Sequence, residues 1–372
     1  MAGADIVWLE SPSRRLRRLA LALATAVLAA LAPSYLHDVG VSGPVTGRVP
    51  GAAGPSRAMT LRLVGGKPLP TPLILGYYDG GGVDSAGWFD MVAHAGSLNG
   101  IVPDWFEIWS QGQITGSPDP GVMAYAERHH LWTFALVQQN ADPGVFHTLL
   151  DNRANAARAR ANLLRLCEAD GFDGINLDFE GVEAADRAAL TRFVQRLATL
   201  LHVHGYYLTL SLPAETADEP ANAWTGAYDY RALGRAADLV LLMAYDDHYA
   251  GGPPGSVAPA PWVAAVARYA VSVLPPSKIV LGVPGYGYDW GGGGSAEALS
   301  YGQAAGLDDT YERGLAGSHF AYSSGGVVHE VYFDDASSFA AQATVAEDYD
   351  LRGIAIWRLG IEDPAVWRIV KP

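Results

Sequence analysis

Three polar residues alternate with three apolar residues near the middle of the chain. The polar residues are Asn176, Asp178 and Glu180, and the apolar residues are Ile175, Leu177 and Phe179. Successive side chains of a β-strand point to opposite faces, so a strand here places the polar groups in one row. Several later strand-like runs are apolar on both faces, which predicts a parallel sheet covered by helices. The polar row would then face inward rather than water, and two inward carboxylates indicate a catalytic site.

Apolar strand-like runs alternate with helical patterns after residue 72. The strands are expected at 73–79, 100–106, 131–137, 172–180, 206–213, 238–245, 278–286 and 352–358, and helices at 87–96, 119–129, 154–169, 183–204, 259–274 and 336–349. Eight such units in about 300 residues predict an α/β fold, a (β/α)8 TIM barrel. Residues 291–335 contain four consecutive glycines and two hairpin-like runs, which predict a small β-rich excursion between the seventh strand and the seventh helix.

Aromatic and carboxylate side chains gather at the carboxyl ends of the predicted strands, where barrel enzymes carry their active sites. They are Tyr77, Tyr78, Asp79, Asp178, Glu180, Glu215, Tyr245, Asp246, Tyr286, Tyr288 and Trp357. Aromatic faces stack on the C–H faces of pyranose rings, and carboxylates bond to sugar hydroxyls. Any one of these aromatic residues could instead belong to the core, but the whole set favours a sugar as the substrate.

The strand from Asp173 to Glu180 resembles the Asp-Gly-x-x-x-Asp-x-Glu strand of glycoside hydrolase family 18, the chitinase superfamily. Gly76-Tyr-Tyr on the first strand, Met243-Ala-Tyr-Asp on the sixth and Trp357 on the eighth fall in the order of that family. The resemblance implies an O-glycosyl hydrolase in which the 2-acetamido group of the substrate is the nucleophile. It covers about residues 73–370, essentially the whole of the expected barrel.

The resemblance also implies a role for each site residue. Glu180 is the general acid and base, Asp178 orients the acetamide and stabilises the charged intermediate, and Tyr245 bonds the acetamide carbonyl. Trp357 forms the floor of the −1 sugar site. The other expected substrate-binding residues are Tyr77, Tyr78, Asn176, Asp246, His248, Tyr286 and Tyr288.

Elementary chemistry is compatible with these roles but leaves the mechanism open. Residues two apart on a strand are about 6.5–7 Å apart, between the carboxylate spacings of retaining and inverting enzymes. A negative Asp178 would raise the pKa of Glu180, as an acid at neutral pH requires. Asn176 is expected to donate its amide to Asp178, and Asp173 is expected to be structural.

Four further stretches resemble the spore-germination and cortex-lytic branch, whose enzymes are N-acetylglucosaminidases acting on peptidoglycan fragments. The stretches are 244–248, 282–290, 300–304 and 329–335. Asn176 stands where chitinases usually have Asp, which also favours peptidoglycan. LysM wall-binding repeats, common in that branch, are not visible in the sequence. A chitinase acting on chitooligosaccharides is one alternative, and a non-catalytic lectin on the same fold is another.

The first 72 residues do not follow the barrel pattern. Four arginines, Arg14, Arg15, Arg17 and Arg18, precede an apolar run from Leu19 to Ala32. This pattern predicts a signal peptide or an uncleaved N-terminal membrane anchor over 1–36. The Gly/Pro-rich residues 37–72 predict a linker, which leaves 73–372 as the catalytic barrel. The protein is therefore expected outside the cytoplasm, either secreted or tethered to the membrane.

Charge and cysteine content limit the partners of the protein. The net charge of −14 argues against nucleic-acid binding. The single Cys167 excludes an intramolecular disulfide and a cysteine-based zinc cluster. The histidine pairs at 129–130 and 202/204 lack a matching carboxylate cluster, so neither a metal nor a cofactor is expected. We expect a monomer whose partner is an amino-sugar polysaccharide.

Overall fold

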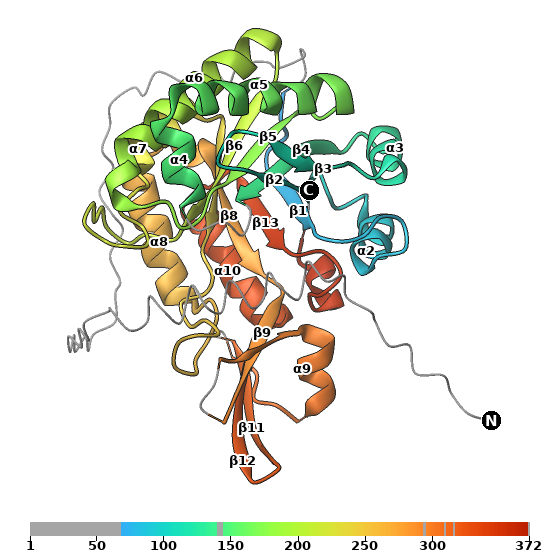
Figure 1. The fold of residues 1–372 in the computed structure, drawn as a ribbon. Helices are drawn as coiled ribbons and strands as arrows, with labels where there is room; N and C mark the ends of the chain where they lie inside the picture. The colour runs from blue at the N-terminus through green and yellow to red at the C-terminus, as the bar shows by residue number, and fades with distance from the viewer. Residues whose placement is uncertain (1–67, 140–143, 293–294, 309, 315–316, 371–372) are drawn as a thin grey trace. The chain divides into compact units, whose positions relative to one another are not determined.

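Eight parallel strands form a closed barrel in the computed structural model, which describes residues 68–139, 144–292, 295–308, 310–314 and 317–370 (Figure 1). The strands are β1 (Leu73–Tyr78), β2 (Gly100–Ile108), β4 (Trp132–Gln139), β5 (Gly174–Asp178), β6 (Tyr207–Pro213), β7 (Leu239–Met243), β8 (Ile279–Pro284) and β13 (Gly353–Trp357). β1 pairs with both β13 and β2, which closes the ring. A short β3 (Ile114–Gly116) pairs antiparallel with β2. The predicted (β/α)8 barrel is confirmed.

Helices cover the outside of the barrel. They are α2 (Ala86–His94), α3 (Pro120–Arg128), α4 (Val145–Asp151), α5 (Arg153–Asp170), α6 (Arg187–His204), α7 (Tyr230–Ala236), α8 (Ala260–Val273) and α10 (Ala336–Asp348), with 3-10 turns at Ala184–Asp186, Pro276–Lys278 and Pro364–Arg368. α5 ends at Gly171, whose φ of 77° lies in the left-handed region that favours glycine. The sequence pattern does not predict α4 and α7, because seven residues are too few to show a clear helical period.

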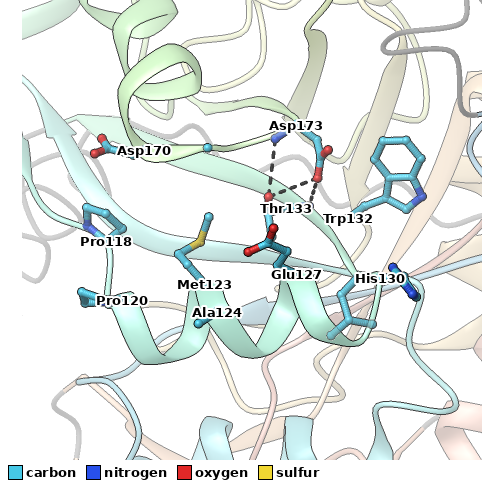
Figure 2. A pocket seen from close by; sticks show the side chains of 12 residues that line it. Pro118, Pro120, Met123, Ala124, Glu127, His130, Trp132, Thr133, Asp170 and Asp173 are labelled. Carbon is cyan, nitrogen blue, oxygen red and sulfur yellow. Dashed lines mark hydrogen bonds between the residues drawn. The ribbon is translucent and has the colours of Figure 1, made fainter.

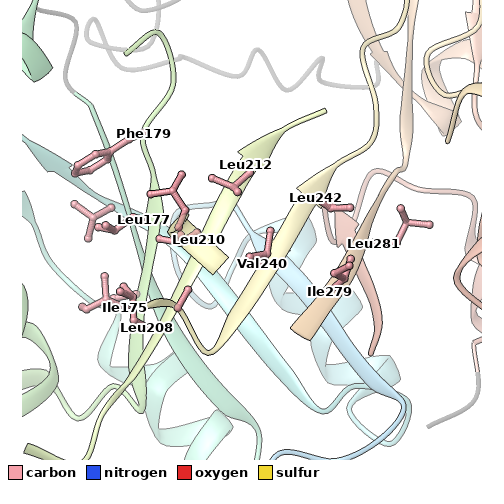
Figure 3. Packing of buried hydrophobic residues seen from close by; sticks show 14 of the residues in the cluster. Ile175, Leu177, Phe179, Leu208, Leu210, Leu212, Val240, Leu242, Ile279 and Leu281 are labelled. Carbon is pink, nitrogen blue, oxygen red and sulfur yellow. The ribbon is translucent and has the colours of Figure 1, made fainter. Parts of the chain in front are cut away.

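The barrel strands bury side chains on both faces. The alternating apolar residues Ile175, Leu177 and Phe179 point outward and pack with residues of β6, β7 and β8 in one large cluster (Figure 3). A smaller cluster, which includes Leu75 and Tyr77, fills the barrel interior. The polar residues of β5 therefore face the interior, as their alternation predicts.

A second, antiparallel sheet lies between β8 and α10, where the β-rich excursion was expected. It contains β9 (Tyr286–Gly291), β10 (Glu297–Ser300), β11 (Ser318–Ser324) and β12 (Val327–Phe333) in the order β10-β9-β12-β11, together with α9 (Tyr301–Leu307) (Figure 1). Gly325 and Gly326 join β11 to β12 with positive φ values of 59° and 82°. Two-residue hairpin turns of this kind require positive φ at both positions, so glycine suits both. The prediction of this excursion is confirmed.

Residues 68–72, which the sequence analysis assigned to the linker, pack on the barrel. The side chain of Leu69 is 6% exposed and joins the interior cluster with Leu73 and Trp132. The guanidinium group of Arg352 donates a hydrogen bond to the Leu69 carbonyl. The rest of the predicted linker and the predicted signal or anchor segment lie outside the described residues. Within the part of the chain that is described, no helix has both the length and the apolar character needed to cross a membrane.

We expect a fragment that begins at Pro68 to be more stable than one that begins at Leu73. The shorter fragment lacks the buried Leu69 side chain, whose burial stabilises by about 1.5–3 kcal/mol. It also leaves Arg352 without its carbonyl partner. Urea unfolding followed by circular dichroism compares the two fragments. Equal midpoints with equal slopes would show that Leu69 contributes nothing to stability.

Candidate active site

The two carboxylates lie at the carboxyl end of β5, toward the inside of the barrel. Asp178 is the last residue of β5 and is 8% exposed, and Glu180 follows in the loop. The backbone N–H of Glu180 donates a hydrogen bond to Gln139 Oε1 at 3.2 Å. The hydroxyl of Tyr228 donates to the Phe179 carbonyl at 2.7 Å. These bonds hold the backbone between the two carboxylates and so position Glu180 relative to Asp178.

Burial raises the pKa of both carboxyl groups. The pKa of Glu180 is raised to about 7, first by burial and then by the negative charges of Asp246 and Asp104. The pKa of Asp178 is also raised, first by burial and then by Glu180 and Asp104. The sequence-based expectation that Asp178 raises the pKa of Glu180 is therefore not supported, because the raised pKa comes from burial, Asp246 and Asp104. A carboxyl group with a pKa near 7 still holds its proton in part at neutral pH, as a general acid requires.

One oxygen of Asp178 lacks a hydrogen-bond donor. Its Oδ1 is buried, and none of the residues that the structure describes donates to it. A buried acceptor without a donor is costly and uncommon in native proteins. An amide N–H of a bound substrate would supply the donor that this oxygen needs.

A buried network of polar side chains supports the carboxylates from deeper in the barrel. Asn176 is fully buried, its Nδ2 donates to Thr209 Oγ1 at 2.9 Å, and its Oδ1 accepts from Ser211 Oγ at 2.9 Å. Ser211 Oγ also lies 2.9 Å from the hydroxyl of Tyr77, which is 1% exposed. The expectation that Asn176 donates to Asp178 is therefore wrong, because its amide bonds to β6. Asn176 and Tyr77 lie below the carboxylates rather than on the accessible surface of the site.

We expect Asn176→Ala to lower stability rather than substrate affinity. The change removes the two hydrogen bonds that Asn176 makes to the hydroxyls of Thr209 and Ser211. Both hydroxyls keep another partner, the Ile175 carbonyl or the Tyr77 hydroxyl, so the expected cost is that of the lost bonds, about 0.5–1.5 kcal/mol each. Each kcal/mol lowers the melting temperature by about 2–4 °C in a domain of this size, which scanning calorimetry measures. The control is Asn155→Ala on α5, at a partly exposed position. A raised KM with an unchanged melting temperature would place Asn176 against the substrate instead.

Aromatic rings form a continuous wall at the mouth of the barrel. Trp357 packs edge-on against Tyr77 with ring centroids 4.9 Å apart, and its ring lies 6.4 Å from that of Tyr245. The wall continues from Tyr245 to Tyr286 at 6.2 Å and from Tyr286 to Tyr288 at 5.6 Å. The structure thus brings together the aromatic residues predicted on the first, sixth, seventh and eighth strands.

Tyr245 and Asp246, which follow β7, connect this wall to the carboxylates. Burial raises the pKa of the Tyr245 hydroxyl. Its pKa is raised further by the nearby Tyr77, Asp178 and Glu180. Asp246 Oδ1 accepts hydrogen bonds from Tyr286 at 2.6 Å and from Tyr288 at 3.0 Å. Asp246 has a φ of 65°, a conformation uncommon for residues other than glycine. Strained backbone of this kind is often found at functional sites.

Two residues that were expected to bind substrate have other partners. Tyr78 points to the outer face of β1, where it is fully buried and donates a hydrogen bond to the Gly82 carbonyl at 2.7 Å. Side chains alternate along a strand, so Tyr78 faces outward because Tyr77 faces inward. His248 Nδ1 lies 3.0 Å from the carbonyl of Pro253, so this ring braces its own loop.

Asp104 is a site residue that the sequence analysis missed. It lies on β2, accepts a hydrogen bond from Gln138 at 2.7 Å, and contributes to the raised pKa of both carboxyl groups. The sequence carried a signal for it, because Asp104 is a lone carboxylate within an apolar strand-like run. Thr209 and Ser211 are polar residues within another such run and carry the same signal.

His147, Glu183 and Asp186 form a further polar cluster that the sequence analysis did not identify. Among the described residues, their potential ligand atoms lie within 4.8 Å of one another. His147 Nδ1 already lies 3.1 Å from both carboxylate oxygens of Asp186. That contact raises the pKa of His147, which favours an ion pair between α4 and the loop that follows Glu180.

A pocket of 710 Å³ lies beside α3, at the end of the barrel where the strands begin (Figure 2). Thr133 near the start of β4 and Asp173 just before β5 line it. Asp173 accepts hydrogen bonds from the N–H and the hydroxyl of Thr133, at 2.8 and 3.1 Å, which fits a structural role for Asp173. Active sites of such barrels lie at the carboxyl ends of the strands. This pocket lies at the opposite end, so it is not the active site.

Known proteins with similar sequences include two from Bacillus subtilis. The chain is 30% identical to the cortical fragment-lytic enzyme of Bacillus subtilis over 283 residues, which are 72% of this chain and 65% of that enzyme. It is 26% identical to the uncharacterized glycosylase YvbX of the same bacterium over 317 residues, which are 80% of this chain and 90% of YvbX. The chain therefore spans slightly less than two thirds of the first relative and most of the second.

Solved structures with the same fold include both cortex-lytic enzymes and chitinases. The spore cortex-lytic enzyme SleL of Bacillus megaterium QM B1551 has a TM-score of 0.73 at 27% identity, covering 80% of this chain and 73% of that one. A chitinase from Chromobacterium violaceum ATCC 12472 has a TM-score of 0.73 at 32% identity, covering 80% and 98%. The sequence model of "Glycosyl hydrolases family 18" matches residues 123–362. The chain belongs to glycosyl hydrolase family 18.

Proposed function

We propose that this glycosyl hydrolase cleaves β-1,4 bonds in glycans that contain N-acetylglucosamine, with bacterial peptidoglycan as its substrate. The observation that carries the proposal is the pair of Asp178 and Glu180 at the carboxyl end of β5. One member of this pair has a pKa near 7, and the other has a buried oxygen that lacks a donor. This arrangement fits a reaction that needs a proton donor and an acceptor for the substrate's amide.

In the first step of this reaction, Glu180 protonates the glycosidic oxygen of the leaving sugar. The acetamide oxygen of the −1 sugar attacks its anomeric carbon and forms a cyclic oxazolinium ion. Asp178 Oδ1 accepts the acetamide N–H, and the positive charge of the oxazolinium favours the ionised form of Asp178. In the second step, Glu180 takes a proton from water as that water attacks the anomeric carbon. Two displacements at one carbon retain its configuration.

The aromatic wall would bind and orient the sugars. The hydroxyl of Tyr245 would donate to the acetamide carbonyl, and Trp357 would stack under the −1 sugar. Asp246, held by Tyr286 and Tyr288, would bond to hydroxyls on the leaving side of the cleaved bond. Such contacts to parts of the substrate that do not react supply orientation for the reacting centre.

Peptidoglycan is favoured over chitin on two grounds. The cortical fragment-lytic enzyme is among the relatives of this chain, and Asn176 replaces an acid that chitinases usually carry. Chitin is the second candidate, because a chitinase shares the fold at 32% identity. The proposed proton donor, Glu180, is present in the sequence, which argues against a non-catalytic lectin. We further propose that the enzyme acts outside the cytoplasm, on the basis of its basic and apolar N-terminal sequence.

Mass spectrometry of products from purified peptidoglycan, spore cortex and chitin tests this proposal. We expect N-acetylglucosamine at the new reducing ends of peptidoglycan or cortex products. Cleavage of chitin alone would overturn the choice of substrate. Binding without cleavage of any of the three glycans would favour a lectin instead.

A further inference from the structure

Two buried carboxyl groups connect α2 to the loop that follows Trp357. Asp90 lies on α2 and Glu362 lies in the loop at residues 358–363, and their side chains are within hydrogen-bonding reach of each other. Glu362 is 6% exposed, and Oδ2 of Asp90 is closed off from solvent. Two carboxylates in contact away from water repel each other strongly when both are ionised. A pair of this kind therefore binds one proton between its members.

The hydrogen bonds of the two side chains leave a place for that proton. Oε2 of Glu362 accepts from the backbone N–H groups of the two residues before it, at 2.8 and 3.0 Å, and Oε1 accepts from the indole N–H of Trp367 at 2.9 Å. Oδ1 of Asp90 lies 2.9 Å from Nδ1 of His94. No donor from the described ranges reaches Oδ2 of Asp90. A proton shared with Glu362 supplies the bond that this oxygen lacks.

The groups that face the pair from each neighbouring element add little positive charge. His94 is the titratable group on α2, and its ring stacks on that of Trp367 in the 3-10 turn at 4.4 Å. The other charged side chains of the loop bond elsewhere, Arg358 to Asp79 at 2.9 Å and Asp363 to two backbone N–H groups. Burial raises the pKa of Glu362 to about 7, and the charge of Asp90 and the hydrogen bond between the two raise it further. Burial also raises the pKa of Asp90.

Two sets of contacts connect Glu362 to Trp357, the residue assigned to the floor of the −1 sugar site. A Cβ on Gly285 would lie 2.5 Å from Cβ of Glu362, so these two residues pack directly against each other. The N–H of Gly285 donates to the Trp357 carbonyl at 2.7 Å. The side chain of Ile361, whose N–H is bonded to Glu362, packs in the same aromatic cluster as Trp357. A movement of Glu362 therefore changes the backbone and side-chain contacts that fix the Trp357 ring.

We infer that Asp90 and Glu362 share one proton and act as positioning residues, which hold Trp357 in place beneath the −1 sugar. This inference rests on the proposed function, in which Trp357 stacks under that sugar. As the pH rises through about 7, the pair releases its proton to solvent and the two carboxylates repel each other. Because the folded-state pKa lies above the unfolded value, the pair stabilises the loop at low pH, and this contribution is lost as the pH rises through about 7.

The affinity of full-length Glu180→Gln for an N-acetylglucosamine oligomer tests this inference, measured by calorimetry at about pH 6 and about pH 8.5. Glutamine removes the titration of the catalytic acid, which acts on kcat, whereas the pair acts on binding. We expect at least about a threefold weaker affinity at the higher pH, because the apparent Kd rises as the fraction of molecules with Trp357 in place falls. Adding Asp90→Asn should remove most of this difference, since its amide N–H donates permanently to Glu362. An unchanged pH dependence in the double variant would overturn the inference.

Thermal unfolding over the same pH range gives a second readout that needs no ligand. The melting temperature of the wild type should fall more steeply with rising pH than that of Asp90→Asn. If Asp90→Asn does not fold, Glu362→Gln carries the same expectation, because its amide donates to Asp90. Parallel falls in the wild type and the folded variant would contradict the shared proton. The control for both readouts is Asp84→Asn, which removes an exposed carboxylate just before α2 and should leave the pH dependence unchanged.

The outcomes also distinguish this inference from the proposed function. Failure to cleave any glycan would overturn the proposed function, and thermal unfolding would still judge the shared proton. Cleavage of a glycan, combined with equal pH dependence of binding with and without Asp90→Asn, would overturn the inference and leave the proposed function standing. An effect of Asp84→Asn as large as that of Asp90→Asn would also overturn the inference, because the loss of any nearby charge would then be sufficient.

Discussion

Glu180→Gln is expected to lower kcat/KM by about 10²–10⁴ while sugar binding survives, the range ascribed to general acid–base catalysis. Glutamine keeps the shape of the side chain but cannot transfer a proton to the leaving oxygen. Steady-state kinetics on a chromogenic N-acetylglucosamine oligomer measures the rate, and calorimetry with an uncleaved oligomer measures binding. The control is Glu168→Gln on α5, which should retain full activity. A loss of less than about tenfold would mean that another group protonates the leaving sugar.

The pH dependence of the wild-type enzyme should report the same group. The active form of Glu180 is protonated, and burial raises its pKa to about 7. Activity should therefore fall as the pH rises through about 7, and this limb should be absent from the residual activity of the glutamine variant. Because the folded-state pKa lies above the unfolded value, Glu180 contributes to stability at low pH, and this contribution is lost as the pH rises toward 7. Glu180→Gln should thus be at least as stable as the wild type at pH 8, which rules out unfolding as the cause of inactivity.

Asp178→Asn is expected to lower kcat by about 10²–10³, with a smaller effect on KM. The substitution removes the negative charge that stabilises the oxazolinium ion, which forms only after substrate has bound. A side-chain amide could also place its own N–H against the acetamide N–H. Single-turnover kinetics isolates the chemical step from binding. A raised KM with an unchanged kcat would show that Asp178 only binds the ground state.

A stable mimic of the intermediate provides a matched test of Asp178. An N-acetylglucosamine thiazoline resembles the oxazolinium ion and should inhibit the wild-type enzyme strongly. It should bind the Asp178→Asn variant more weakly, because its ring nitrogen would lose the carboxylate partner. An oligomer with glucose at the −1 position lacks the acetamide and should not be cleaved. Cleavage of that oligomer would contradict the participation of the acetamide.

The parts of this site that were predicted correctly depend on local periodicity. The alternation from Gly174 to Glu180 was sufficient to place Asn176 and Asp178 toward the barrel interior, because side-chain direction on a strand changes with every residue. The Gly76-Tyr-Tyr stretch contains no such alternation. Which of its side chains face the barrel interior is decided by the pairing of β1 with β2 and β13. The sequence therefore could not show that Tyr78 faces outward.

The partners of Asn176 depend on contacts that are distant in the sequence. Asn176 lies beside Thr209 in the register between β5 and β6, and that register brings the two side chains within hydrogen-bonding distance. A local pattern in one strand carries no information about the register with the next strand. The same limit applies to Asp104, which is placed near the carboxylates by the registers of β2 with β4 and of β4 with β5.

The configuration of the first product tests the central claim most directly. Proton NMR at early times, during cleavage of an N-acetylglucosamine oligomer, distinguishes the β from the α anomer before mutarotation. Participation of the acetamide predicts that the β anomer appears first and that no sugar becomes covalently attached to the protein. An α anomer at early times, or a sugar found on Asp178 by mass spectrometry of the trapped enzyme, would contradict the account.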